Sequence, residues 1–155
     1  RHLDRRWIEW MEHWPVFLRN QSEQFEARSV MVAIQPSPSL FFTGMTGSRL
    51  PISIAHGEGR AVFENSAQQR KAGSYITLKF VDHHGTQTDI YPLNPSGSPL
   101  GITGVTSTDG RFTILMPHPE RHVDPTHHPR WTRLPPRDHG DGLPLFRNAV
   151  TYFES

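Results

Sequence analysis

An apolar run leads into a proline-flanked histidine in the segment Phe112-Thr113-Ile114-Leu115-Met116-Pro117-His118-Pro119-Glu120-Arg121. The apolar run is typical of a buried strand. Pro119 disfavours the helical region for the residue before it, so we expect an extended backbone at His118. Residues two apart in an extended segment project to the same side, which predicts that the imidazole of His118 lies beside the carboxylate of Glu120.

An imidazole held by a carboxylate is suited to proton transfer. A carboxylate bonded to one ring nitrogen of His118 fixes the tautomer and leaves the other nitrogen free to take or give a proton. The alternative for the same residues is a rigid turn after a strand, with Glu120 and Arg121 in solvent. Sequence context decides between the two interpretations.

The composition bounds the class of protein. The chain has 155 residues, the size of one domain with a sizeable core. Its 16 Lys and Arg against 15 Asp and Glu give a formal charge of +1, which indicates neither a nucleic-acid partner nor an acidic one. The sequence has no cysteine, and this excludes disulfides and thiolate metal sites and removes the commonest soft nucleophile.

The sequence shows no membrane or secretion signal. No apolar run approaches the roughly 20 residues that a membrane helix needs, and Arg1 to Arg6 lack the apolar core of a signal peptide. We therefore expect no membrane association and a cytoplasmic location. The first residue is not Met, so we also expect a piece of a longer protein.

The hydrophobic pattern predicts both strands and helices. Strands are expected at residues 30–34, 50–55, 61–63 and 75–81, with an edge strand at 86–91. Asp109-Gly110 predicts a hairpin of residues 101–106 and 111–115. Helices are expected for residues 1–12, for 65–70 with Asn65 as cap, and for 145–153, and residues 122–142 are expected to form a long surface loop.

A second candidate site follows the expected strand at residues 50–55. The segment His56-Gly57-Glu58-Gly59-Arg60 places two glycines around an acidic residue, which permits close approach of a ligand to the backbone. A tight turn into the next strand explains the same residues equally well. His56, Gly57, Glu58 and Gly59 are therefore candidate substrate-binding residues without a decisive pattern.

Two other patterns invite binding functions and are weaker. Histidines cluster at His83-His84 and His127-His128, but neither cluster contains a helical i,i+4 pair or a His-Glu-x-x-His pattern, so we expect no metal site. Arg130-Trp131 with Arg133 and Arg137 is compatible with a nucleic-acid patch. The near-zero net charge favours a solvated loop instead.

A series of motifs, taken together and in order, resembles the C-terminal glutaminase domain of phosphoribosylformylglycinamidine synthase, the large single-chain form in purine biosynthesis. The resemblance covers residues 13 to 155, and the ordered series is far more specific than any one motif. The motifs are Trp14-Pro15, Phe17, Arg19-Asn20, Ser22 to Arg28, Ser37-Pro38-Ser39, Gly44-Met45, Gly47-Ser48, His56 to Arg60, Tyr91-Pro92, Asn94-Pro95, Gly97-Ser98-Pro99, Gly101-Ile102-Thr103, Met116 to Arg121 and Phe146 to Ala149.

The resemblance implies a fold and a reaction. The fold is part of a three-layer α/β, flavodoxin-like glutamine amidotransferase domain, with a mostly parallel sheet and an added β-hairpin. The reaction is a triad-type hydrolysis of L-glutamine, in which a cysteine attacks the side-chain amide, forms a glutamyl thioester and releases ammonia. The family's catalytic histidine and glutamate fall on His118 and Glu120. His118 activates the thiol and protonates the leaving ammonia, and Glu120 orients the ring.

The resemblance also implies partners. The ammonia passes to a separate synthetase domain of the same synthase chain, where ATP drives amidination of formylglycinamide ribonucleotide. ATP and magnesium are expected only in that domain, and no cofactor is expected in this segment. The alternative function is a noncatalytic glutamine-binding or complementing module that docks onto a synthetase.

The sequence departs from the family at the nucleophile. The family's cysteine lies on a strand-to-helix elbow upstream of the Trp-Pro motif, and this sequence has no cysteine. Residues 1–12 match the family poorly, whereas residues 13–155 correspond to the C-terminal part of the domain. We therefore expect the chain to be inactive alone, and we expect the strands at 30–34 and 50–55 to lack neighbours.

Overall fold

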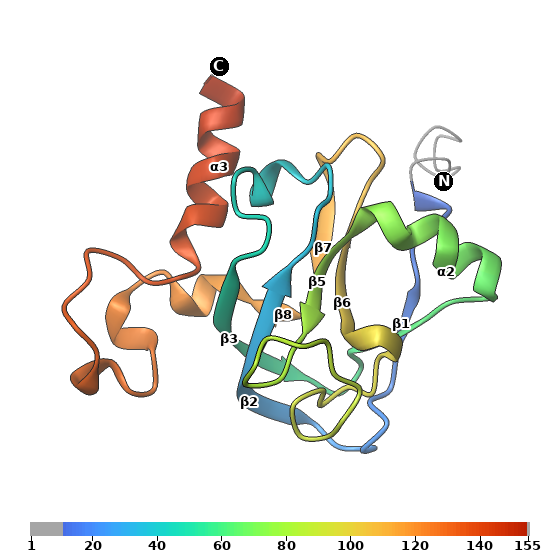
Figure 1. Ribbon diagram of the computed structural model, residues 1–155, viewed down its shortest axis with the longest axis horizontal. Helices are drawn as coiled ribbons and strands as arrows, with labels where there is room; N and C mark the ends of the chain where they lie inside the picture. The colour runs from blue at the N-terminus through green and yellow to red at the C-terminus, as the bar shows by residue number, and fades with distance from the viewer. Residues whose placement is uncertain (1–10, 155) are drawn as a thin grey trace, which may run out of the picture.

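The computed structural model describes residues 11–154 and consists mainly of one six-stranded antiparallel sheet (Figure 1). A smaller two-stranded sheet accompanies it. The strands are β1 (Val16–Leu18), β2 (Glu26–Ile34), β3 (Arg49–His56), β4 (Arg60–Val62), β5 (Ile76–Phe80), β6 (Ile102–Thr106), β7 (Thr113–Leu115) and β8 (Pro117–His118). The helices are η1 (Leu40–Phe42), α2 (Ser66–Ala72), η2 (Gly73–Tyr75), η3 (Pro99–Gly101), η4 (Pro119–His122), η5 (Pro125–His127), η6 (Trp131–Arg133) and α3 (Leu143–Glu154).

The large sheet nearly closes into a barrel. Its order is β7-β6-β5-β2-β3-β8, so the two strands at its ends are consecutive in sequence and are separated only by Met116. The amide of Met116 still donates to the carbonyl of Thr103 on β6 at 3.0 Å, whereas Pro117 already pairs with Ile54 on β3. One bent segment therefore joins both ends of the sheet.

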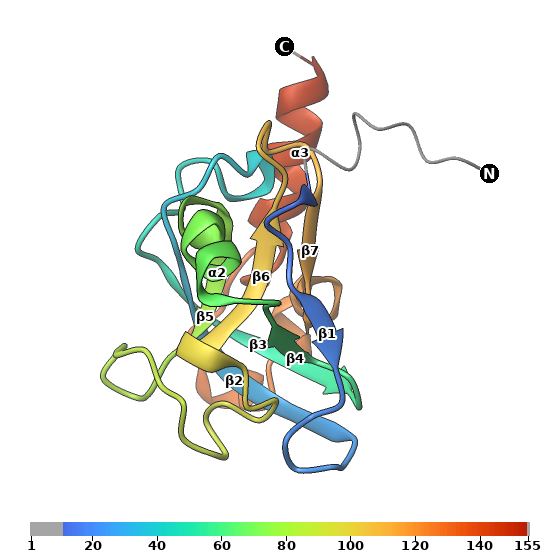
Figure 2. The same cartoon turned by 90° about the vertical axis from the view of Figure 1, so that its right-hand side faces the viewer.

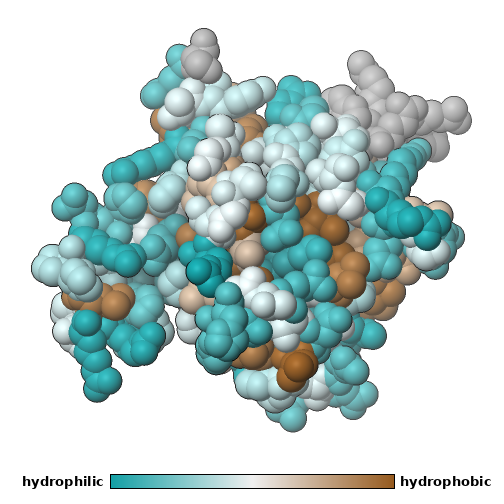
Figure 3. All heavy atoms as spheres, in the orientation of Figure 1, coloured by the Kyte–Doolittle hydropathy of each residue, from teal (hydrophilic) through white to brown (hydrophobic). Residues whose placement is uncertain are grey.

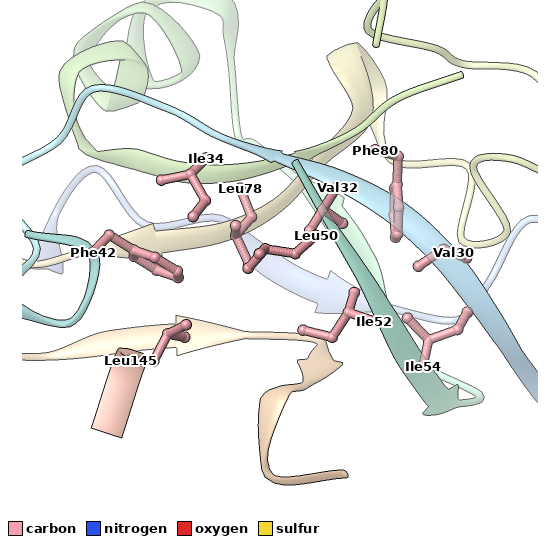
Figure 4. Close-up of a cluster of buried hydrophobic side chains, with 10 residues drawn as sticks. All are labelled: Val30, Val32, Ile34, Phe42, Leu50, Ile52, Ile54, Leu78, Phe80 and Leu145. Atoms are coloured by element: carbon pink, nitrogen blue, oxygen red, sulfur yellow. The ribbon is translucent and has the colours of Figure 1, made fainter. Parts of the chain in front are cut away.

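Alternation of apolar residues along the strands produces the main core. Every second residue of β2 and β3 faces inward, and the two strands pair Val30 with Ile52 and Val32 with Leu50. Because successive strand residues point to opposite faces, this alternation gives one apolar side. Figure 4 shows the resulting cluster, whose members are Val30, Val32, Ile34, Phe42, Leu50, Ile52, Ile54, Leu78, Phe80 and Leu145.

A second, smaller core lies on the other side of β5 and β6. Ile76, Ile102 and Val105 from the large sheet pack with Ala61 of β4, and Phe17 of β1 packs against this group. Figure 2 shows β1 and β4 beside β6. The two-stranded sheet thus covers part of the face of the large sheet that the main core does not use.

The expected parallel sheet is wrong. Every strand pair in the described residues 11–154 is antiparallel. A parallel pair needs a crossover of about a dozen residues or more, usually a helix. Residues 107–112 between β6 and β7 are too few for one, and no α-helix lies between β2 and β3. The strands at 30–34 and 50–55 were also expected to lack neighbours, yet β2 lies between β5 and β3, and β3 between β2 and β8.

Most local predictions agree with the structure. The strand predictions at 30–34, 50–55 and 75–81 and the hairpin of 101–106 with 111–115 are confirmed within a few residues. Asn65 caps α2, since its side chain accepts from the amides of Ala67 and Gln68. The edge strand at 86–91 is wrong, because only an isolated bridge between Val81 and Gln87 forms there. The helix expected at 1–12 lies almost entirely outside the described residues.

The C-terminal helix α3 is anchored to the body at its beginning. Leu145 is buried in the main core, and the side-chain nitrogen Nδ2 of Asn148 donates to the carbonyls of Phe41 and Thr43 at 2.9 Å each. The rest of α3 projects from the body (Figure 1), and 76% of Phe153 is exposed.

Figure 3 shows apolar side chains reaching the surface at several separate places on one face. Within residues 11–154, no helix is long and apolar enough to cross a membrane.

Gly110 is one of the positions where the backbone leaves no room for a side chain. Its φ is +74°, and a Cβ there would lie 1.9 Å from the carbonyl oxygen of Pro38. Gly44 has nearly the same φ, +73°, with no atom within 4 Å of the added carbon. Gly44→Ala therefore measures the conformational cost alone, about 1 kcal/mol of unfolding free energy. Gly110→Ala adds the clash, for a loss of about 3 kcal/mol or more. Urea denaturation of both variants measures the difference, and equal losses would contradict the close approach of the hairpin to residue 38.

Candidate functional site

The contact expected between His118 and Glu120 is present. The Nδ1 atom of His118 lies 2.7 Å from Oε1 of Glu120. His118 is the last residue of β8, with φ −108° and ψ 84°, and η4 begins at Pro119. Glu120 therefore lies in a helical turn and not in the extended segment that the sequence predicted. The two side chains meet because the chain turns immediately after His118.

The geometry assigns the proton on the His118 ring. A carboxylate oxygen only accepts hydrogen bonds, so Nδ1 of His118 donates its N–H to Glu120 and Nε2 carries the lone pair. The His118 side chain is 31% exposed and that of Glu120 is 54% exposed. Nε2 of a partly exposed, oriented imidazole can accept a proton from an approaching nucleophile.

His122 anchors η4, the turn that carries Glu120, to β3. The sequence did not predict this role. It is buried at the end of η4, and its Nε2 lies 2.9 Å from the hydroxyl of Ser53. Ser53 is also the residue that pairs with His118 in the ladder between β3 and β8. His122 therefore fixes η4 to the strand beside His118. Its spacing of four residues from His118 was the only available signal.

The glycine-containing loop after β3 is held from inside by Asn20. The Asn20 side chain donates to the carbonyls of His56 and Gln24 at 2.7 and 2.9 Å, and its oxygen accepts the amide of Gly59 at 3.0 Å. The Asn20 amide also donates to the carbonyl of Gly57 at 2.8 Å. Asn20 belongs to one of the motifs described above, but nothing local in the sequence indicated these contacts.

The four candidate residues of this loop differ in their accessibility to solvent. The ring of His56 is buried and points inward, so it does not present itself to solvent. Gly59 lies directly against that ring, because a Cβ there would be 2.2 Å from Cε1 of His56. A Cβ on Gly57 would meet nothing within 4 Å, and Glu58 is exposed. The Gly57–Glu58 backbone is therefore the accessible part of the loop.

The histidine clusters do not converge on a metal site. Among residues 11–154, no group of three or more His, Asp or Glu side chains is arranged to hold a metal ion.

A cavity of about 380 Å³ lies within the 122–142 loop, lined among others by His122, Trp131 and Arg137. Arg137 pairs there with Asp141 at 2.8 Å. Neither His118 nor Glu120 lines this cavity, so it is separate from their contact.

Comparison with known proteins identifies the family. The sequence matches the CobB/CobQ-like glutamine amidotransferase domain over residues 3–153. The chain belongs to this family. This amidotransferase chain also resembles the solved structure of PurLQS from Thermotoga maritima, with a TM-score of 0.64 and 24% identity over 90% of its length. The chain spans about half of that chain, 53%.

Three buried imidazoles of this amidotransferase domain make its stability depend on pH. Burial is the main cause that lowers the pKa of His13, His56 and His122 below the usual 6.5. The folded state therefore binds fewer protons than the unfolded state, so the stabilisation is complete above about pH 6.5 and is lost as the pH falls.

Urea denaturation over a pH series from mildly alkaline to mildly acidic measures this effect. We expect the free energy of unfolding to decrease on acidification, and His122→Gln to reduce the slope because one of the three groups is removed. His84 is exposed, so His84→Gln is the matched control that keeps the slope. Stability that is constant or rises on acidification would contradict the burial of neutral imidazoles.

Proposed function

We propose that this chain supplies the proton-transfer half of a glutaminase centre, with L-glutamine as the substrate. The observation that carries the proposal is the 2.7 Å contact between Nδ1 of His118 and Oε1 of Glu120, on the accessible side of a domain that belongs to the glutamine amidotransferases. The pair has the form of the base and its orienting acid in triad catalysis.

The steps at His118 follow from its free nitrogen. Nε2 takes the proton of a thiol, and the thiolate attacks the side-chain amide carbon of glutamine. The imidazolium, stabilised by Glu120, then gives its proton to the departing nitrogen, so that ammonia leaves and a thioester remains. Attack of water on the thioester, with His118 again as base, releases glutamate and restores the thiol.

The thiol must come from outside the 155 residues, since the sequence contains no cysteine. His118 and Glu120 are exposed enough for a segment carrying the nucleophile to reach them. We propose that the accessible backbone of Gly57 and Glu58, held by the Asn20 contacts and by His56 packed on Gly59, binds the substrate beside that nucleophile. His56 and Gly59 then shape the loop from inside.

We further propose the wider role of a phosphoribosylformylglycinamidine synthase in purine biosynthesis. The fold likeness to PurLQS and the ordered motifs support it. The ammonia then serves the ATP-dependent amidination of formylglycinamide ribonucleotide in a separate synthetase domain, where ATP and magnesium bind, in the cytoplasm. A noncatalytic glutamine-binding module remains the second candidate, because the sequence lacks a nucleophilic thiol.

Complementation tests the catalytic role. The chain alone is expected to release no ammonia from glutamine above buffer, whereas mixing it with a separately produced segment that carries the family's elbow cysteine restores release. His118→Ala lowers the restored rate roughly 100-fold or more, and Glu120→Gln lowers it less, because the ring loses its orientation and not the base.

The exposed His84 gives the matched control, and His84→Ala keeps the restored rate. Full activity of the His118→Ala mixture would contradict the assignment of the base. Glutamine binding by the mixture without any turnover would favour the noncatalytic module. Turnover by the chain alone, at the rate of an intact glutaminase, would contradict the need for an external thiol.

A further inference from the structure

The cavity of about 380 Å³ within residues 122–142 has the form of a small-molecule site. The segment that surrounds it carries η5 and η6 and lies at the side of the body (Figure 1). Pockets that hold small molecules commonly measure about 300–1,000 Å³ and have mostly apolar walls with a few polar groups. The apolar part of this wall consists of Pro125, Trp131, Leu134, Pro135 and Pro136. A molecule with an apolar body therefore fits the cavity.

Backbone hydrogen bonds hold one wall of the cavity against the end of η4. The amide of Gly140 donates to the carbonyl of Val123 at 2.9 Å. The amide of Gly142 donates to the carbonyl of His122, also at 2.9 Å. The contact is close, because a Cβ on Gly140 would lie 2.1 Å from the carbonyl oxygen of His122. Asp141, between the two glycines, is thus held at a defined place in the wall.

The imidazole of His122 has one nitrogen available to a ligand. The residue is 2% exposed and lines the cavity. Its Nε2 lies 2.9 Å from the hydroxyl of Ser53, whereas Nδ1 makes no hydrogen bond to any residue of the described range 11–154. Polar groups of buried residues normally have a hydrogen-bond partner. An occupant of the cavity that bonds to Nδ1 would supply the missing one.

The charged groups that line the cavity leave one carboxylate unbalanced. Arg137 pairs with Asp141 at 2.8 Å, so these two charges offset each other. Nδ1 of His128 accepts a backbone amide at 3.1 Å, and a ring nitrogen that accepts carries no hydrogen, so this ring is neutral. Burial lowers the pKa of His122, which keeps that ring neutral near pH 7. The carboxylate of Asp124 remains.

Asp124 and Trp131 both favour a positively charged group. Oδ1 of Asp124 accepts from the amide and the hydroxyl of Thr126, at 2.8 and 2.6 Å. These two bonds lower the pKa of Asp124, so its carboxylate is ionised. Its Oδ2 makes no hydrogen bond within the described part of the chain. The Trp131 side chain is half exposed, and the face of an indole ring attracts cations.

We propose that this cavity binds a small organic cation, an amine with an apolar body. The ammonium group is held by Asp124, the apolar body lies against Trp131 and the proline-rich wall, and Nδ1 of His122 is a further hydrogen-bond partner. The site is separate from the contact of His118 with Glu120. It exists whether or not the chain takes part in glutamine hydrolysis.

Three probes of similar shape and different charge test the site in the full 155-residue chain. They are phenethylammonium, the neutral 2-phenylethanol and the anion 3-phenylpropionate. The indole N–H resonance of Trp131, assigned by its absence from the spectrum of Trp131→Phe, is followed by ¹H–¹⁵N NMR during each titration. We expect a saturable shift with phenethylammonium, binding of the alcohol that is weaker by roughly five-fold or more, and no binding of the anion.

Asp124→Asn isolates the effect of the charge. Asparagine caps helices as well as aspartate does, so η5 keeps its beginning while the carboxylate charge is lost. We expect phenethylammonium to bind this variant roughly five-fold or more weakly, and 2-phenylethanol to bind it as before. The matched control is Asp138→Asn, because Asp138 is an exposed carboxylate of the same loop that does not line the cavity. This control leaves the binding of all three probes unchanged.

Each result of the titrations supports or overturns the site. A Trp131 resonance that is insensitive to all three probes would overturn it and identify the contents of the cavity as water. Equal affinities for the cation and the alcohol, or tighter binding of the anion, would overturn the preference for a positive charge. An unchanged affinity for phenethylammonium in Asp124→Asn would overturn the part assigned to Asp124. No probe is a substrate of glutamine hydrolysis, so failure of the proposed function would leave these results intact.

Discussion

Closure of the sheet at Met116 is the constraint on which the site depends. β7 and β8 are adjacent in sequence but lie at opposite ends of the strand order, and Met116 is the one residue between them. Its amide belongs to the β6 ladder, whereas the next residue pairs with β3. The two prolines that follow restrict the backbone on both sides of His118. The segment that carries His118 is thus fixed by strand pairing before it and by the two prolines beside it.

Polar contacts hold β3 at two places. On one side, His118 pairs with Ser53, and Ser53 also contacts the buried His122. At its C-terminal end, β3 finishes at His56, whose ring and backbone carbonyl both hydrogen-bond the Asn20 side chain. β3 therefore carries the supports of the proton-transfer pair and of the glycine-containing loop. A change in the register of this strand would displace both.

The sequence predicted the features that depend on neighbouring residues. Runs of apolar, β-branched and aromatic residues located β2, β3 and β5, Asn65 marked the start of α2, and Asp109-Gly110 marked the hairpin. The contact of His118 with Glu120 followed from two prolines, although Glu120 reaches it from a helical turn. These signals arise within a few residues, where propensity and backbone restriction act directly.

The features that sequence reasoning missed depend on residues far apart in the chain. The antiparallel closure requires β8 to pair with a strand more than sixty residues earlier, and the Asn20 contacts join residues 20 and 56. The resemblance suggested a mostly parallel sheet, a property of a whole domain, whereas every strand pair within residues 11–154 is antiparallel. The segment at 86–91 has strand-like composition, but it forms only an isolated bridge.

The tautomer of His118 is the most direct test of the central claim that Glu120 orients the catalytic imidazole. Long-range ¹H–¹⁵N NMR of the neutral ring distinguishes a hydrogen on Nδ1 from one on Nε2. The account predicts a hydrogen on Nδ1 in the native protein and a mixture of tautomers in Glu120→Ala. A hydrogen on Nε2 in the native protein, or the same tautomer ratio in both proteins, would contradict it.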